Sequence, residues 1–225
     1  MTIYIIPIVE GDTEVHCVER LFIRIWNEII CCPHRLQVLQ PIKVQRDRFL
    51  SKKSDLLEQQ VQAAACVLKS KMKSDRLSTG CILVLLDAEH DGCPVEISRD
   101  ILHRSQDAQS DMEIRCVIAQ RMLENWIVAG ARTLSNVPDF PKNVQVPDNI
   151  DSLNGAEWLE QQLRSIKPNR KYKKTVDAKR LINAFSIEDC RAKSRSFQKL
   201  VKELQACIPP EASSSDETND DSSES

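Results

Sequence analysis

The sequence lacks several features that would place it in a common class of protein. Its nine cysteines are scattered and include no CxxC pair, so their spacing predicts neither a zinc finger nor a disulfide framework. No apolar run approaches the roughly 20 residues that a membrane-spanning helix needs. The N-terminus has no charged segment followed by a small-residue cleavage site, so no signal peptide is predicted. We expect a soluble, cytoplasmic protein that has no contact with membranes and keeps its thiols reduced.

The net charge of −2 conceals two segments of opposite charge. Residues 164–202 carry 13 Lys and Arg against 3 Asp and Glu, a balance of +10, whereas residues 211–225 carry 6 acidic residues and no basic ones. We predict a core over residues 1–130, a helical and basic extension over 131–207 that packs on it, and a disordered acidic tail over 208–225.

Apolar runs and amphipathic segments alternate along the first 130 residues. Their order, strand then helix four times over, is typical of an α/β fold with a mostly parallel sheet of about four strands flanked by helices. The predicted strands are 3–9, 36–45, 80–87 and 112–119, and the predicted helices are 13–31, 54–72, 94–106 and 121–130. Residues 131–154 are predicted to form a loop, and further helices are predicted at 155–165, 175–184 and 194–206.

Carboxylates directly follow two of the predicted strands. Glu10 ends the first strand and precedes Gly11, and Asp87 ends the third strand within the stretch DAEHDG (87–92). In an open parallel sheet, ligands bind beyond the carboxyl ends of the strands, so these acids would share one crevice if their strands are neighbours. Further acids close to them in the sequence are Glu14, Glu89 and Asp91.

Several carboxylates in one crevice repel each other, and a divalent cation is the usual means of keeping them ionised. Hard oxygen ligands suit Mg²⁺ or Mn²⁺, which commonly act on phosphate groups. The pattern therefore predicts a metal site in which Glu10 serves as a ligand or as a general base. The alternative interpretation is that the two acidic stretches are a helix N-terminus and a polar turn without chemical function.

Five short stretches along the chain form an ordered set of motifs. They are VEGDTE (9–14), QRDRFL (45–50), DAEHDGCP (87–94), QRMLENWIVAG (120–130) and SRSF (194–197). In order and spacing they resemble the standalone Toprim-like family DUF4276, over about residues 3–204. Toprim domains also occur in topoisomerases, primases and OLD-family nucleases, where a glutamate after one strand is paired with a DxD motif after a later strand.

The resemblance implies a Rossmann-like Toprim fold and a Mg²⁺-dependent nuclease. It places Glu10 at the Toprim glutamate, Asp87 at the first acid of the DxD motif and Glu89 at the second, where aspartate is usual. The longer Glu89 side chain puts the metal geometry in question. The further metal ligands that the resemblance implies are Glu14, Asp91 and Glu124. Several Toprim nucleases act in prokaryotic antiphage defence beside an ATPase of ABC or AAA type, so such a partner is also implied.

The basic segment 164–202 predicts a nucleic-acid-binding face, and within it the stretch RSIKPNRKYKK (164–174) surrounds Tyr172 with basic residues. Tyr172 is suited to stack on a base, and Lys171 or Lys174 would offset negative charge that develops during catalysis. The expected nucleic-acid-binding residues are Arg170, Lys171, Tyr172, Lys173, Lys174 and Lys179. The alternative interpretation is a solvated helix face of ordinary lysine content.

Three functions compete on this basis. The first is two-metal hydrolysis of DNA or RNA, with Glu10, Asp87 and Glu89 holding Mg²⁺ or Mn²⁺. The second is a non-catalytic Toprim-like subunit that binds nucleic acid or an ATPase partner. The third, a phospho-receiver domain with Asp87 as phosphoacceptor, is disfavoured because the sequence offers no fifth strand in the expected place. The choice between DNA and RNA, the identity of a partner and the formation of a homo-oligomer stay open.

Overall fold

The computed structural model describes residues 1–88 and 92–210. Two of the expected metal ligands, Glu89 and Asp91, lie outside the described residues, as does the expected acidic tail from residue 211 onward. Within the described ranges, no helix is both long and apolar enough to cross a membrane.

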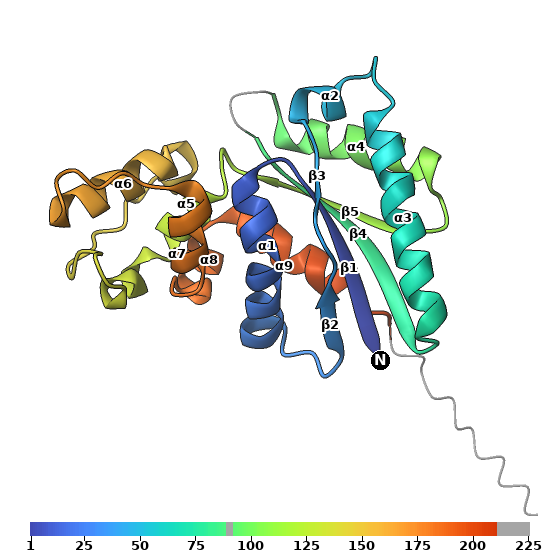
Figure 1. The fold of residues 1–225 in the computed structure, drawn as a ribbon, viewed down its shortest axis with the longest axis horizontal. Helices are drawn as coiled ribbons and strands as arrows, with labels where there is room; N and C mark the ends of the chain where they lie inside the picture. Colours follow the sequence, from blue (N-terminus) through green and yellow to red (C-terminus); the bar gives the residue numbers. More distant parts are fainter. Residues whose placement is uncertain (89–91, 211–225) are drawn as a thin grey trace, which may run out of the picture.

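A parallel sheet of five strands lies at the centre of the protein (Figure 1). The strands are β1 (Thr2–Val9), β2 (Arg35–Val38), β3 (Ile42–Lys43), β4 (Ser78–Asp87) and β5 (Glu113–Ala119). Their order is β2-β1-β4-β5, and β3 pairs with the last two residues of β1. The predicted α/β fold with a parallel sheet is confirmed.

The central strands are buried on both faces, which explains their nearly continuous apolar sequence. Alternate residues of β1 enter two separate cores: Ile3 and Ile5 belong to one, and Ile6 and Ile8 belong to the other. The strands β4 and β5 alternate in the same way. A sheet with this pattern has to be covered by helices on both sides.

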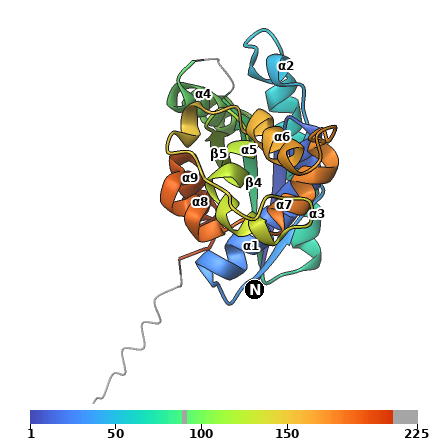
Figure 2. The same ribbon diagram turned by 90° about the vertical axis from the view of Figure 1, so that its left-hand side faces the viewer.

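Helices cover the two faces of the sheet (Figure 1). On one face lie α2 (Arg46–Leu50), α3 (Leu56–Ser74) and α4 (Pro94–Ala108), and on the other lie α1 (Asp12–Ile25) and α9 (Arg195–Ala206). A lobe of short helices extends from the α1 side (Figures 1 and 2). Its helices are α5 (Glu124–Ala129), α6 (Gly155–Ile166), α7 (Lys179–Ile182) and α8 (Ile187–Lys193). The lobe and the α1 face share one continuous hydrophobic core.

The predicted strand 36–45 is divided into β2 and β3. The division lies at Pro41, which has no amide hydrogen to donate to a strand ladder. The partner strand tolerates Pro7 at the same place, because β2 pairs with residues 2–5 of β1 and β3 pairs only with residues 8 and 9. Pro7 and Pro41 thus both lie at the gap between the β1–β2 and β1–β3 pairings.

Several predicted helices also differ from the observed ones. The predicted helix 13–31 ends as α1 at Ile25 and continues as a π-helical turn, Trp26–Ile30. The N-cap of α1 is Gly11, so the helix begins one residue earlier than predicted. Helices absent from the prediction are α2, within QRDRFL, and α8, together with two 3-10 helices, Ala131–Asn136 and Ile150–Ser152, inside the predicted loop. The predicted helix 175–184 consists of a π-helical turn, Lys174–Ala178, followed by α7. The helices absent from the prediction and the two π-helical turns are too short to show a clear helical periodicity.

The sheet changes direction between β1 and β4. From β1 the chain crosses to β2 on one side, and from β4 it crosses to β5 on the other. Val9 pairs with Leu85, so Glu10 and Asp87 follow at the same edge of the sheet. Ligands bind at such a switch point in open α/β sheets, because the diverging connections leave a crevice there.

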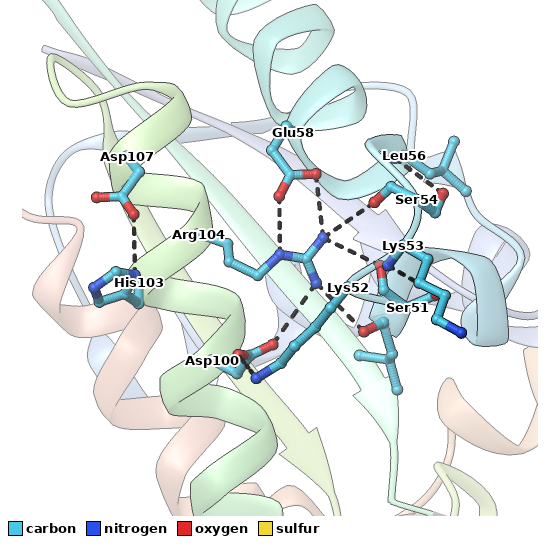
Figure 3. A network of polar contacts seen from close by, with 11 residues as sticks. Ser51, Lys52, Lys53, Ser54, Leu56, Glu58, Asp100, His103, Arg104 and Asp107 are labelled. Carbon is cyan, nitrogen blue, oxygen red and sulfur yellow. Dashed lines mark hydrogen bonds and ion pairs between the residues drawn. The ribbon is translucent and has the colours of Figure 1, made fainter.

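A largely buried arginine joins three segments on the face of the sheet that α2, α3 and α4 cover (Figure 3). Arg104 of α4 donates through Nε and Nη2 to the two carboxylate oxygens of Glu58, at 2.8 and 3.2 Å. It also donates to the backbone carbonyls of Leu50 and Ser54, each at 3.3 Å. Burial raises the pKa of Glu58, but the hydrogen bond and the positive charge of Arg104, together with a backbone hydrogen bond, outweigh it and hold that pKa below its usual value. This network fixes the α2–α3 connection against α4.

Substitution Arg104→Met is expected to lower the free energy of unfolding by about 2 kcal/mol, because Glu58 and two carbonyls lose their donor in a partly buried place. Urea denaturation measures the loss. The matched control is Arg132→Met, whose guanidinium pairs with Asp189 but is 75% exposed, and whose loss should cost no more than about 0.5 kcal/mol. Equal losses in the two variants would contradict a structural role of the Arg104 network.

Candidate active site

A pocket of about 450 Å³ lies at the switch point of the sheet. Its walls come from the β1–α1 turn, the end of β4, the connection between β5 and α5, and the start of the π-helical turn at 174–178. Charged and polar residues dominate its lining, among them Glu10, Glu14, Asp87, Arg121, Asn154 and Lys174. The structure thus brings three of the expected metal ligands and one expected catalytic lysine into one pocket.

Of the two pocket acids Asp87 and Glu14, Asp87 has the more strongly raised pKa. Burial raises its pKa well above the usual value for aspartate, and the negative charges of Glu14, Glu124 and Glu10 raise it further. The positive charge of Lys174 offsets this rise only in part. Clustered acids that destabilise each other in this way are typical of functional sites.

Glu14 is buried and folds back from the first turn of α1. A Cβ atom on Gly11 would collide with its carboxylate, so a glycine at this position lets the observed Glu14 conformation form. Burial raises the pKa of Glu14, and the backbone amides of Glu14 and Gly11 counteract the rise. The glutamate therefore lies against the helix N-terminus while it also lines the pocket.

Arg46 of α2 joins the ends of the two central strands. Its Nε lies 3.5 Å from Oε2 of Glu10, and its guanidinium donates to the carbonyl oxygens of Asp87 at 3.3 Å and of Ala88 at 3.4 Å. The side chain is buried, so it holds the Glu10 carboxylate beside β4. The sequence pattern does not assign Arg46 to the site, although the QRDRFL motif that contains it was the available signal.

Glu124 is a buried acid beside the pocket. Its Oε1 accepts from the Tyr172 hydroxyl at 3.5 Å and lies 3.9 Å from Nζ of Lys174. Burial, followed by the charge of Glu124, raises the pKa of Tyr172. The Tyr172 ring packs against the hydrophobic core. In this structure the ring therefore does not stand free on the surface, as a base-stacking platform requires.

Many basic residues of 164–202 are paired with acids, several of them from other parts of the chain. The pairs are Arg164 with Glu160, Lys167 with Asp139, Arg170 and Arg180 with Asp177, Lys174 with Glu124, and Lys199 with Glu203. All four expected nucleic-acid-binding lysines, Lys171, Lys173, Lys174 and Lys179, are exposed, and of these Lys174 is paired with an acid. The balance of +10 in the sequence thus overstates the positive charge that this segment presents.

The motif QRMLENWIVAG contributes Arg121 and Met122 to the pocket lining, and its other residues, with SRSF, fix the segments around the pocket. Asn125 donates to the carbonyls of Ile150 and Leu153 at 2.8 and 3.1 Å, and its Oδ1 accepts from the amide of Gly155 at 3.0 Å. These bonds fix the loop that carries the pocket residue Asn154. The indole of Trp126 and the amide of Gln120 both donate to Ser196 Oγ, at 2.9 and 3.2 Å. The end of β5 is thereby attached to α9.

Two carboxylates of the pocket have the chemistry that a divalent cation requires. Glu10 and Asp87 supply the oxygen ligands that Mg²⁺ and Mn²⁺ prefer, and their repulsion would be relieved by a cation between them. Across residues 1–88 and 92–210, however, no group of three His, Cys, Asp or Glu side chains is arranged to hold a metal ion. Glu10 and Asp87 thus have the right ligand type for a divalent cation, and the described part of the chain supplies these two ligands.

Comparison with known proteins gives a family match and a likeness to solved structures. The family described as a domain of unknown function (DUF4276) matches residues 9–205. Among solved structures, the C-terminal region of the Burkholderia pseudomallei OLD protein is similar, with 16% sequence identity and a TM-score of 0.42, over 91% of this chain and 98% of that chain. No curated protein matches the sequence.

Proposed function

The chain belongs to the DUF4276 family, and from the pocket at the switch point of its sheet we propose that it is a divalent-metal-dependent phosphodiesterase acting on nucleic acid. The observation that carries this proposal is the meeting of Glu10 and Asp87, from adjacent parallel strands, in a pocket that Arg121 and Lys174 also line. Metal-dependent phosphodiester hydrolysis uses both kinds of group: acids that hold the metal and cations that stabilise the negative charge of the phosphate.

Each residue has a role in this proposal. Glu10 and Asp87 hold the metal, and Glu89 and Asp91, which follow β4 in the sequence, are the proposed source of further ligands. A bound Mg²⁺ or Mn²⁺ supplies Lewis acidity toward the phosphate. Arg46 keeps the Glu10 carboxylate at the strand end. Lys174 offsets the negative charge of the phosphate.

A cleavage assay with Mg²⁺ and Mn²⁺ on single-stranded DNA, duplex DNA and RNA tests the proposal. Substitution Glu10→Gln is expected to lower the cleavage rate at least about 100-fold, because a metal ligand loses its charge. The matched control is Glu19→Gln, an exposed acid on α1, which should stay within about twofold of the unmodified protein because it lies outside the pocket. If no substrate is cut with either metal, the enzymatic proposal is wrong.

A second candidate function is a non-catalytic subunit that binds nucleic acid or a partner ATPase. The observation that favours it is the lack of a three-ligand metal group in the described part of the chain. Isothermal titration with Mn²⁺ separates the two candidates. Binding that Glu10→Gln abolishes supports the enzyme, whereas nucleic-acid binding without any Mn²⁺ binding supports the subunit.

A further inference from the structure

We propose that Arg121 and Lys174 form an anion subsite that holds a backbone phosphate of an unpaired nucleic-acid strand beside the acids of the pocket. The substrate class rests on the proposed function, but the subsite itself is a separate claim about two cations. Arg121 has no role in the predictions from sequence. It lines the same pocket as Glu10, Glu14 and Asp87.

The backbone of Arg121 supports a functional position. Its φ angle is +63°, in the left-handed region that residues other than glycine seldom adopt, at a cost on the order of 1 kcal/mol. Such strain is kept where the surrounding structure requires a particular side-chain direction. Here the residue follows β5 directly, and its guanidinium donates through Nη1 to the carbonyl of Ser152. That bond attaches Arg121 to the loop that carries the pocket residue Asn154.

The guanidinium of Arg121 keeps most of its donors for a ligand. An arginine has five N–H donors in a planar fork that matches two phosphate oxygens. Among residues 1–88 and 92–210, the bond to Ser152 is its only hydrogen bond, and it forms no ion pair with the acids of the pocket. A cation that lines an acidic pocket without pairing to it is placed for an external anion.

Lys174 supplies the second cation from a different segment. Its Nζ is 3.9 Å from Glu124, at the outer limit of an ion pair, and its side chain is 58% exposed. The buried Asp177 accepts from the amide of Lys173 at 2.8 Å and from the guanidinium of Arg170. These bonds fix the start of the π-helical turn, so Lys174 is held at the rim of the pocket.

The small size of the pocket and the burial of Glu14 favour an unpaired strand over a duplex. Its volume of about 450 Å³ is that of a small-ligand site, and its acids include a buried Glu14. A flexible single strand can place one phosphate into such a recess, since its backbone is free to bend. The phosphates of a duplex lie on a stiff cylinder, which the pocket walls would keep away from Asp87.

Binding of a short fluorescein-labelled oligothymidylate, followed by fluorescence anisotropy, tests the subsite. All proteins carry Asp87→Asn and the buffer contains EDTA, so the strand stays intact. Arg121→Gly removes the guanidinium while keeping a residue that accepts positive φ. We expect at least about tenfold weaker binding and a log–log salt slope flatter by about 0.7, the value for one phosphate contact on a single strand.

Three further variants serve as controls. Arg121→Lys keeps the charge and should bind more tightly than Arg121→Gly, Lys174→Gln should weaken binding as Arg121→Gly does, and the exposed Arg132→Ala should leave binding within about twofold. Unchanged affinity and salt slope in Arg121→Gly, or no binding by the parent protein, would overturn the subsite. Equal affinity for a duplex of the same sequence would overturn the unpaired strand. If Arg121→Gly fails to fold, Arg121→Lys and Lys174→Gln decide.

Mn²⁺ titration separates this proposal from the proposed function, and in this experiment the parent is the unmodified protein, which keeps Asp87. Arg121→Gly should bind Mn²⁺ as well as or better than the parent, since it removes positive charge from the pocket, whereas Glu10→Gln should lose binding. A protein that binds the oligonucleotide through Arg121 but cuts no substrate keeps the subsite and refutes the enzyme. A protein that cuts its substrate but binds it equally well without Arg121 keeps the enzyme and refutes the subsite.

Discussion

Replacing Asp87 with asparagine is expected to abolish cleavage and, at the same time, to stabilise the fold. The rate should fall at least about 1,000-fold, because the substitution removes a charged metal ligand while leaving the shape of the pocket intact. The free energy of unfolding should rise by about 1 kcal/mol, because one of four mutually repelling acids becomes neutral. Thermal melting should detect this as an increase of about 2–4 °C for a chain of this length.

The pH dependence of stability gives this prediction a second measurement. Asp87 and Glu14 have raised pKa values in the folded protein, so each contributes stability that is complete below the ordinary carboxyl pKa of about 4 and is lost as the pH rises through its raised value. Urea denaturation in EDTA should therefore contain a fall in stability from these two acids as the pH rises, opposite in sign to the contribution of acids with a lowered pKa such as Glu58. In Asp87→Asn the fall should be smaller, since only Glu14 still contributes.

The control for both measurements is Glu19→Gln, an exposed acid of α1 outside the pocket. It should keep the cleavage rate, the melting temperature and the pH slope of the unmodified protein. An Asp87→Asn variant that is less stable at neutral pH would contradict the electrostatic account of the pocket. An active Asp87→Asn variant would contradict the proposed metal ligand.

The substitution Gly130→Ala is expected to cause the largest loss of stability, more than about 3 kcal/mol. An added Cβ would lie 2.6 Å from the ring of Phe185 and closer still to the carbonyl oxygen of Ser186. The Ser186 amide donates to the Gly130 carbonyl at 2.8 Å, so two backbone segments are already in contact. Neither backbone can yield without breaking that bond, and Phe185 also makes an edge contact with Phe197 in the core.

Gly11→Ala is the matched comparison. Its Cβ would meet the end of the Glu14 side chain instead of backbone, and that side chain can rotate. The free energy of unfolding should change by no more than about 1 kcal/mol, although Glu14 would leave its position in the pocket. Urea denaturation of both variants measures the difference, and similar losses would show that the contact of Gly130 with Ser186 has little energetic weight.

The placement of Glu10 and Asp87 could be predicted from the sequence because each follows a strand whose apolar run is long and uninterrupted. Arg46 and Arg121 could not be predicted in the same way. Arg46 lies in a five-residue helix, too short to show a periodic pattern, and its partners are carbonyls of β4, 41 and 42 residues away in the sequence. The role of Arg121 depends on a left-handed backbone conformation, which residue type alone does not indicate for arginine.

For the basic segment 164–202, the sequence predicts more exposed charge than the structure presents. Its charge is evident from the sequence, but its acidic partners Asp139 and Glu124 lie far before the basic residues that they pair with and meet them only in the folded protein. Counting charges along the chain cannot anticipate such pairs, because ion pairing depends on distances in space.

By itself, the sequence determined which strands are buried on both faces, which helices alternate with them, and which acids follow the strands, since these follow from local periodicity. Only the tertiary structure decided that β1 and β4 are neighbours, that Arg46 holds Glu10 beside β4, and that Arg121 and Lys174 line one pocket with the acids. The physical reason is that strand pairing and pocket lining join residues separated by tens of positions. Such contacts are selected by the packing of the whole core, whereas local periodicity reports only on the few residues on either side.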